Sequence, residues 1–151
     1  MTYVYFLPIP IYTMVYQCPV CLAEPNSHSF KQKTSHNGVA VYYTCPAEAI
    51  RYDDIPGIVA HYDGVLSENN HGCKDQSVGA WMWILDCQGF EVKHMREIGV
   101  AIALAKLITS TYATTLVKII VANPTWHIRI IINVVWPFLS QSVRDCIYID
   151  I

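Results

Sequence analysis

Short apolar runs alternate with longer segments of helical periodicity from residue 39 to the end of the chain. The runs VAVYYTC (39–45), GAWMWILDC (79–87) and LVKIIVA (116–122) are rich in β-branched and aromatic residues, and CIYIDI (146–151) is similar. Such runs are typical of strands. Because residues 79–87 are apolar without alternation, they predict a strand that is covered on both faces.

The segments between these predicted strands carry helix signals. Asp53 and Asp54 are suitable N-cap residues, and Pro56 suits the first turn of a helix that runs through about Ser67. Between residues 94 and 112, apolar residues recur every three or four positions, as on one face of a helix. The resulting order of strand, helix, strand, helix, strand, helix, strand predicts an α/β domain with a largely parallel sheet.

The segment VANPTWHIRIIINVVWPFLS (121–140) holds the most apolar of these helices. Asn123 is expected to end the strand and cap the helix, with Pro124 at the first helical position. The helix runs toward Trp136, and Pro137 ends or kinks it. Its apolar residues fall on more than one side, so one side can pack on the sheet while another meets a ligand, a membrane or a partner protein. Burial of both sides in the core is the alternative.

The composition limits the class of protein. The chain has 151 residues, which suits one domain with a core, and 53% of them are hydrophobic against 15% charged. No apolar run reaches the roughly 18 residues that a membrane span needs. The formal net charge of -2 gives no basic surface for nucleic acid, so we predict no nucleic-acid partner.

The N-terminal segment, MTYVYFLPIPIYTMVYQC, is apolar, lacks a basic start and contains Pro8 and Pro10. We interpret it as an arm packed on the core, with contact to a membrane as the alternative, and not as a secretory signal. Asn37-Gly38 is a turn signal ahead of the first predicted strand. We therefore place a boundary near residue 36, with the arm in residues 1–35 and the α/β domain in residues 36–151.

Two closely spaced cysteines suggest a metal site in the arm. The six cysteines are otherwise scattered, which argues against a disulfide framework and predicts a reducing, cytoplasmic location. Cys18 and Cys21, followed by His28 and His36, form a C-x2-C-x6-H-x7-H set that could hold Zn²⁺. The alternative is a pair of buried cysteines that flank a turn at Pro19.

The sequence offers little support for catalysis. Asp86, Cys87 and His94 lie near one another in the sequence, but no nucleophile elbow or oxyanion-hole motif accompanies them. We expect Asp86 to cap a turn at a strand end and His94 to lie on the surface in a first helical turn. There is also no glycine-rich phosphate loop. We therefore predict that the chain is not an enzyme.

The second half of the chain resembles a known family. The stretch WMWILDCQGFEVKHM, a helix, and then LVKIIVANPTWHIRIIINVVWPFLSQSVRDCIYI resemble the CRAL-TRIO lipid-binding domain over about residues 79–150. The likeness extends back to residue 38, where a strand followed by a helix fits the start of the domain. It is greatest to the divergent branch that includes the BCH domains and the lipid-binding-like domains of some Rho GTPase-activating proteins. The matching positions are Asp86 and Gly89 after one strand, Asn123-Pro124-Thr125-Trp126 after another, Pro137-Phe138-Leu139 at a helix end, and the strand 146–149.

The resemblance implies a sheet that floors a hydrophobic pocket and a gate helix that closes over it. The ligand-binding residues implied in this way are Trp83, Trp126, Ile130, Val134 and Phe138. Family members usually continue past the last strand, and part of the site for a charged head group lies in that further element. No phosphoinositide specificity is therefore carried over, and the C-terminus of the domain is expected to be truncated.

Two functions follow from the resemblance. The first is non-enzymatic binding of a hydrophobic ligand, a lipid above all, for transfer or presentation at a membrane surface by a cytoplasmic or peripheral protein. The second is a protein-interaction module on the same fold, which binds a small GTPase or its regulator. Arg129, Lys118 and Arg144 are candidates for a small basic rim that meets lipid head groups or an acidic partner, although ordinary solvated surface charges are the favoured explanation.

Overall fold

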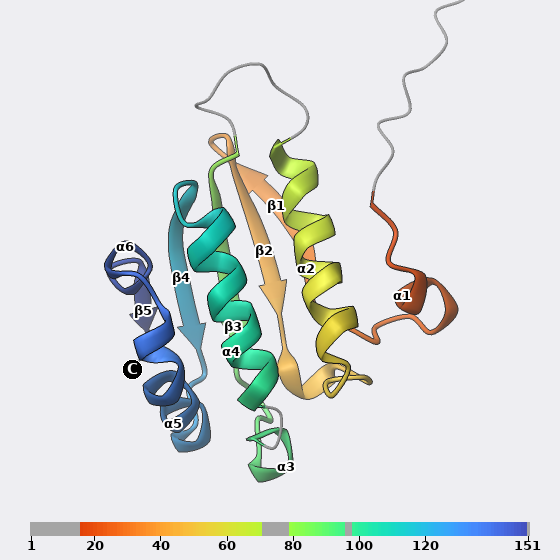
Figure 1. Cartoon of the computed structure of the whole chain (residues 1–151), viewed down its shortest axis with the longest axis vertical. Coiled ribbons are helices and arrows are strands. Elements are labelled where there is room, and N and C mark those ends of the chain that lie inside the picture. The colour runs from red at the N-terminus through yellow and green to blue at the C-terminus, as the bar shows by residue number, and fades with distance from the viewer. Residues whose placement is uncertain (1–15, 71–78, 96–97, 151) are drawn as a thin grey trace, which may run out of the picture.

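One five-stranded sheet organises the chain. The computed structural model describes residues 16–70, 79–95 and 98–150 (Figure 1). The strands lie side by side in sequence order, with β1 antiparallel to β2 and all later neighbours parallel. They are β1 (Lys31–His36), β2 (Val39–Thr44), β3 (Trp81–Asp86), β4 (Leu116–Ala122) and β5 (Ile147–Ile149). The predicted α/β class with a largely parallel sheet is confirmed.

Three helices connect the parallel strands: α2 (Ile55–Asn70), α4 (Ile98–Leu107) and α5 (Trp126–Val135). Parallel crossovers are almost always right-handed, and here each one steps in the same direction along the sheet. The helices must therefore gather on one face, and Figure 1 shows α2 and α4 in front of the strands. The shorter elements are α1 (Pro19–Ala23), η1 (Pro46–Glu48), α3 (Val92–Met95), the π-helical η2 (Ile108–Tyr112), η3 (Trp136–Phe138) and α6 (Gln141–Arg144).

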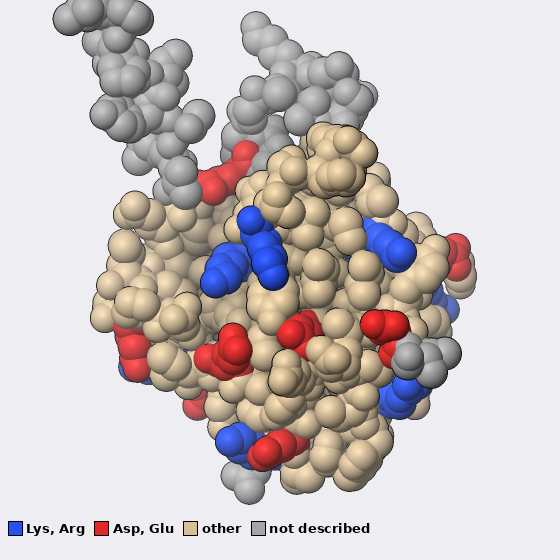
Figure 2. Space-filling view, turned by 180° about the vertical axis from the view of Figure 1, so that it is seen from behind, with Lys and Arg blue, Asp and Glu red and all other residues tan. Residues whose placement is uncertain are grey.

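Strand β3 shows the consequence of this one-sided arrangement. Trp81 and Trp83 are buried under the helices, whereas Met82 and Ile84 on the opposite face are only partly buried. The prediction that residues 79–87 are covered on both faces was wrong, because no described crossover helix lies on the second face. Figure 2, seen from behind, shows acidic and basic side chains scattered among mostly uncharged residues.

The edge strand β1 was missed by the sequence analysis. Its sequence, KQKTSH, has no apolar residue and every position is exposed, so it carries no hydrophobic pattern. It pairs with β2 through the predicted Asn37-Gly38 turn, where both residues have positive φ (51° and 79°). The boundary that we expect near residue 36 falls at this hairpin. Phe30, just before β1, stacks on Tyr62 with ring centroids 3.9 Å apart, so the segment before β1 packs on the same core.

The start of α5 also differs in detail from the prediction. Thr125, not Asn123, is the N-cap, and its side chain accepts a hydrogen bond from the Ile128 N–H at 3.4 Å. Asn123 instead takes a positive φ of 49° and donates from Nδ2 to Oδ1 of Asp86 at 2.9 Å. Helix α5 ends at Val135, and Pro137 lies in the 3-10 turn that follows. The prediction that Pro137 marks the helix end is confirmed.

The segment predicted as one helix over residues 94–112 is divided into several elements. A short α3 precedes α4, and the last turn widens into the π-helical η2. Tyr112 anchors this turn, because its carbonyl accepts a hydrogen bond from Trp81 Nε1 at 3.2 Å and its hydroxyl donates to Asp63. Of the predicted N-terminal arm, residues 1–15 lie outside the described residues.

Candidate functional site

An apolar cavity of about 200 Å³ lies between the sheet and its helices. Alternate residues of the strands form its floor, because successive strand side chains point to opposite faces. The floor residues are Thr44, Trp83, Leu85, Ile119, Val121 and Ile147. Helices α2, α4 and α5 supply most of the roof, which is mainly aliphatic. Such a lining is suited to the hydrocarbon part of a ligand.

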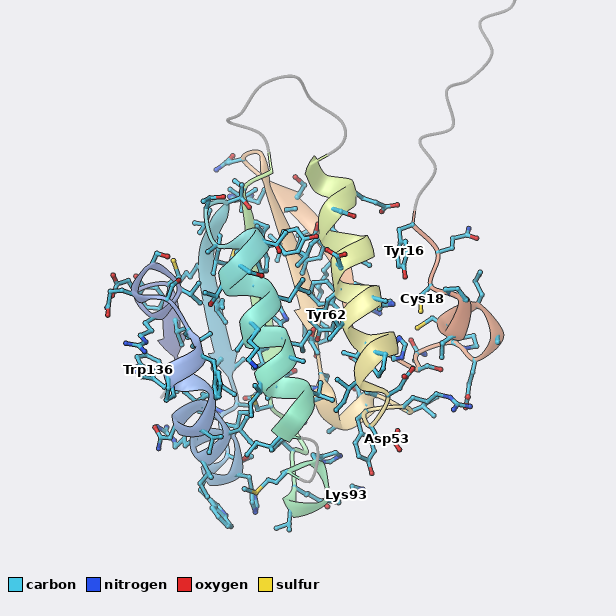
Figure 3. All side chains as sticks on the ribbon, viewed as in Figure 1. Tyr16, Cys18, Asp53, Tyr62, Lys93 and Trp136 are labelled. Carbon is cyan, nitrogen blue, oxygen red and sulfur yellow. The ribbon has the colours of Figure 1, made fainter. Side chains whose placement is uncertain are left out.

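The polar groups of the cavity floor satisfy one another. Trp83 donates a hydrogen bond from Nε1 to Thr44 Oγ1 at 2.9 Å, and the hydroxyls of Thr44 and Tyr62 lie 3.3 Å apart. Figure 3 shows Tyr62 in the layer between α2 and the sheet. Burial raises the pKa of Tyr62 above its ordinary value, so this hydroxyl stays neutral. The cavity therefore presents little unpaired polarity to a ligand.

His94 adds one polar side chain to the cavity wall. It is buried, and its Nδ1 accepts a hydrogen bond from the Glu91 N–H at 2.8 Å. Because Nδ1 is occupied as an acceptor, the neutral ring carries its proton on Nε2. Burial lowers the pKa of His94, which favours this neutral form. The prediction that His94 is a surface residue was wrong, since α3 folds back over Phe90, whose ring stacks on His94 at 5.3 Å.

The contacts of Asp86 and Cys87 indicate a role in the fold and not in catalysis, as the sequence suggested for Asp86. The Asp86 carboxylate accepts hydrogen bonds from Asn123 Nδ2, from the Gln88 N–H at 3.1 Å and from the Tyr43 hydroxyl at 2.7 Å. The predicted turn-capping role is thus confirmed, and the bond from Asn123 is the main cause that lowers the pKa of Asp86. Burial raises the pKa of Cys87 to about 12, so its thiol stays protonated and is a poor nucleophile.

Helix α5 has an inner face and an outer face, both apolar. Of the five residues expected to bind ligand, Trp83 lines the cavity. The other four lie on exposed surface: Trp126, Ile130, Val134 and Phe138. The residues of this segment that line the cavity are instead Ile128, Ile131, Ile132, Val135 and Leu139. These positions recur at helical spacing on the side that packs on the sheet, which turns the side with Trp126 and Ile130 outward.

Cations accompany several exposed aromatic side chains near α5. Lys106 lies over the Phe138 ring at 5.2 Å, Arg144 over Trp136 at 5.6 Å, and Lys118 over Tyr148 at 4.4 Å. Figure 3 shows Trp136 at the outer edge of the molecule beside α5. We refer to Trp126, Ile130, Val134, Trp136 and Phe138 as the outer apolar set. This set combines exposed apolar surface with nearby positive charge.

A Cys/His cluster lies on the far side of α2 from α4. The potential ligand atoms of Cys18, Cys21, His28 and His61 all lie within 4.8 Å of one another. Three of the four predicted metal ligands are thus brought together. The fourth, His36, lies on the exposed edge strand β1, where its Nε2 contacts Asn37 Nδ2 at 3.3 Å. His61 occupies the fourth position because α2 packs against the segment that contains the other three residues.

Comparison with known proteins identifies the family. A sequence model of the CRAL/TRIO domain matches residues 16–150, and no curated protein matches the chain. The crystal structure of Sfh5 superposes with a TM-score of 0.64 at 13% identity, covering 82% of this chain and 48% of that one. The chain thus spans about half the length of that structure. The chain belongs to the CRAL/TRIO domain family, whose members are generally lipid-binding or lipid-transfer modules.

Within residues 16–70, 79–95 and 98–150, no helix combines the length and apolar character needed to cross a bilayer.

Proposed function

We propose that this chain binds a lipid or a similar hydrophobic ligand without catalysing a reaction on it, and that the apolar cavity receives the hydrocarbon portion. The observation that carries this proposal is the cavity itself, which is lined mainly by apolar side chains from the sheet and from α2, α4 and α5. Each methylene that moves from water into such a site contributes about 0.8 kcal/mol. Even a short acyl segment therefore supplies several kcal/mol.

Uptake requires the cavity to enlarge. Its volume of about 200 Å³ lies below the roughly 300–1,000 Å³ of typical ligand pockets. An engineered apolar cavity of about 150 Å³ holds benzene, which sets the scale of what fits without movement. We therefore propose that α5 acts as the gate. Its inner residues Ile128, Ile131 and Ile132 pack against Phe90 and Val121, and displacement of this helix opens the cavity beside the sheet.

The membrane is the proposed source of the ligand. Exposed Trp126 and Phe138 are suited to the boundary between head groups and acyl chains, and the neighbouring Lys106 and Arg144 are suited to anionic head groups. The protein is then cytoplasmic and associates peripherally with membranes. Contact through the outer apolar set would place the gate helix at the bilayer surface, so that opening exposes the cavity to lipid.

His94 is the proposed polar contact for the ligand. Its neutral ring keeps one N–H donor, on Nε2, at the cavity wall. This donor suits an ester, carboxyl or hydroxyl oxygen near the start of an acyl chain. A neutral donor makes no strong demand for a charged head group, so we propose no phosphoinositide specificity.

A cavity-filling variant tests this function. Ala105 is 5% exposed and lines the cavity, so Ala105→Leu should occupy part of the volume. The matched control is Ala103→Leu on the same helix, at a position that does not line the cavity. The variants are incubated with phosphatidylcholine–phosphatidylserine vesicles, re-isolated and extracted for lipid. We expect uptake by wild type and Ala103→Leu and a loss of at least tenfold in Ala105→Leu. Equal uptake by Ala105→Leu would contradict the cavity as the binding site.

A second candidate function is favoured by the outer apolar set. Protein-interaction modules also use exposed aromatic anchors with adjacent charges, and the small cavity volume does not by itself demand a ligand. In that case the chain acts as a BCH-like scaffold for a small GTPase or its regulator. Lipid uptake distinguishes the two functions. A scaffold acquires no lipid from vesicles, whether as wild type, as Ala103→Leu or as Ala105→Leu.

A further inference from the structure

We propose that Cys18, Cys21, His28 and His61 form a structural zinc site that fastens the segment before β1 to helix α2. The ligands come from three places in the chain: the N-cap and third residue of α1, the loop before β1, and α2. This inference is independent of lipid binding.

The distances within the cluster match a tetrahedral metal site. Cys18 Sγ lies 3.5 Å from His28 Nδ1, and Cys21 Sγ lies 3.8 Å from His61 Nδ1. With Zn–S bonds of about 2.3 Å and Zn–N bonds of about 2.0–2.1 Å, tetrahedral geometry places neighbouring sulfur and nitrogen ligands about 3.6 Å apart. These two separations agree with sulfur–nitrogen edges of such a tetrahedron, and all four ligand atoms lie within 4.8 Å of one another.

Both histidine rings are oriented for metal binding by their second nitrogen. His28 Nε2 lies 3.1 Å from Asp54 Oδ2, and His61 Nε2 lies 2.7 Å from the Phe30 carbonyl oxygen. A carboxylate and a carbonyl only accept hydrogen bonds, so each Nε2 carries the proton. The lone pair of each Nδ1 then faces the sulfurs. Zinc-binding histidines have the same arrangement, with the other ring N–H donated to a carboxylate or backbone carbonyl.

The packing of α1 gives an independent reason for a metal. Helix α1 has five residues, none of them buried, and Leu22 is 63% exposed. Hydrophobic burial by the helix itself therefore does little to hold it. Of its flanking residues, Cys18 is buried, and Figure 3 shows Cys18 between α1 and α2. A bond network through zinc would fix this segment where apolar packing does not.

The choice of zinc follows from the ligand types. Two thiolates and two imidazoles in tetrahedral geometry are a standard set for structural Zn²⁺, whereas Ca²⁺ and Mg²⁺ prefer oxygen ligands. All four positions are filled by protein atoms, so the site has no open coordination position for catalysis. The site is also adjacent to the cavity, since His28 contributes to the cavity wall.

Metal analysis of the full-length protein tests the proposal. Wild type, purified under reducing conditions without added metal, should contain one zinc per chain by elemental mass spectrometry. His61→Ala and Cys21→Ser should lose it, whereas the matched controls His36→Ala and Cys146→Ser should keep it. Because a ligand variant can also unfold, the wild-type protein is stripped with a chelator and titrated with Co²⁺. We expect the visible absorption bands of a tetrahedral site with two thiolates at one equivalent.

Three results would overturn the zinc site. The first is a wild-type protein that contains no zinc and develops no tetrahedral Co²⁺ spectrum. The second is a disulfide between Cys18 and Cys21 in the protein purified under reducing conditions, detected by peptide mass spectrometry. The third is a folded His61→Ala variant that retains one zinc per chain, which would remove His61 from the ligand set.

Discussion

The indole Nε1 of Trp83 donates a hydrogen bond to Oγ1 of Thr44, 2.9 Å away on the neighbouring strand. The same threonine hydroxyl lies 3.3 Å from the hydroxyl of Tyr62, which reaches down from α2. Three polar groups that line the cavity, two from the sheet and one from α2, are thus paired with one another. This pairing lets large aromatic side chains line an apolar space without leaving buried donors unsatisfied.

Thr44 should therefore be sensitive to loss of its hydroxyl. Thr44→Val keeps the shape of the side chain but leaves the Trp83 N–H unpaired, which is expected to lower the free energy of unfolding by about 1–3 kcal/mol. Urea unfolding followed by tryptophan fluorescence measures the change. Thr44→Ser is the control because it keeps the hydroxyl, and it should retain most of the stability. Equal stability of Thr44→Val and wild type would show that this bond contributes little.

The two faces of α5 should respond differently to truncation. Ile131 is 6% exposed on the inner face and Trp126 is 62% exposed on the outer face. Ile131→Ala should destabilise the fold by about 2–5 kcal/mol because it leaves a cavity in the core. Trp126→Ala should change stability by less than about 0.5 kcal/mol, as is usual for surface substitutions. Thermal or urea unfolding of the two variants checks this, and the reverse order would show that α5 is rotated.

The outer apolar set should control membrane affinity. The double variant Trp126→Ser, Ile130→Ser removes two exposed apolar side chains from one face of α5. Sedimentation with vesicles that contain phosphatidylserine should show at least a tenfold weaker association, since buried apolar area drives interfacial binding. Leu22→Ser is the control, because Leu22 is as exposed as Trp126 but lies on α1, on the opposite side of the molecule (Figure 1). An effect of equal size in Leu22→Ser would argue against α5 as the membrane-facing element.

Alkaline pH should destabilise the fold through its buried tyrosines. Burial is the main cause that raises the pKa of Tyr42 from 10.0 to about 12. Above pH 10 the unfolded chain loses this proton while the folded chain keeps it, so stability falls as pH rises from about 10 toward 12. Tyr42 alone should cost about 1 kcal/mol at pH 11. Unfolding measured in urea at pH 8 and pH 11 gives the change, and Tyr42→Phe should reduce the loss. An unchanged loss in Tyr42→Phe would assign the effect to other groups.

The parallel strands and the helices between them could be predicted because each of these strands is an apolar run in the sequence. The runs that contain β2, β3 and β4 are β-branched and aromatic, and each is followed by a segment with helical periodicity. The polar edge strand β1 could not be predicted in this way, since Lys31 to His36 bury no side chain and carry no hydrophobic pattern. The one-sided cover of the sheet depends on strand order, which a local pattern does not contain.

Of the residues expected at the ligand, Ile130 and Val134 lie on the outer face of α5, whereas the cavity is lined by residues of its inner face. Both sides of α5 carry isoleucine and valine, so hydrophobicity alone does not distinguish them. Arg129 and Asn133 are both exposed and lie on the side that includes Ile130. These two polar residues are the signal in the sequence that marks the outer face. His61, in contrast, lies 33 residues beyond His28, and only the packing of α2 brings it to the Cys/His cluster.

The central claim is that the cavity holds a lipid, and direct extraction tests it most simply. The full-length protein is purified without detergent, extracted with organic solvent, and the extract is analysed by mass spectrometry against the protein concentration. The account predicts close to one lipid per chain, either as purified or after incubation with phosphatidylcholine–phosphatidylserine vesicles, and a marked loss in Ala105→Leu. Wild-type protein that is folded but carries no lipid under both conditions would contradict it.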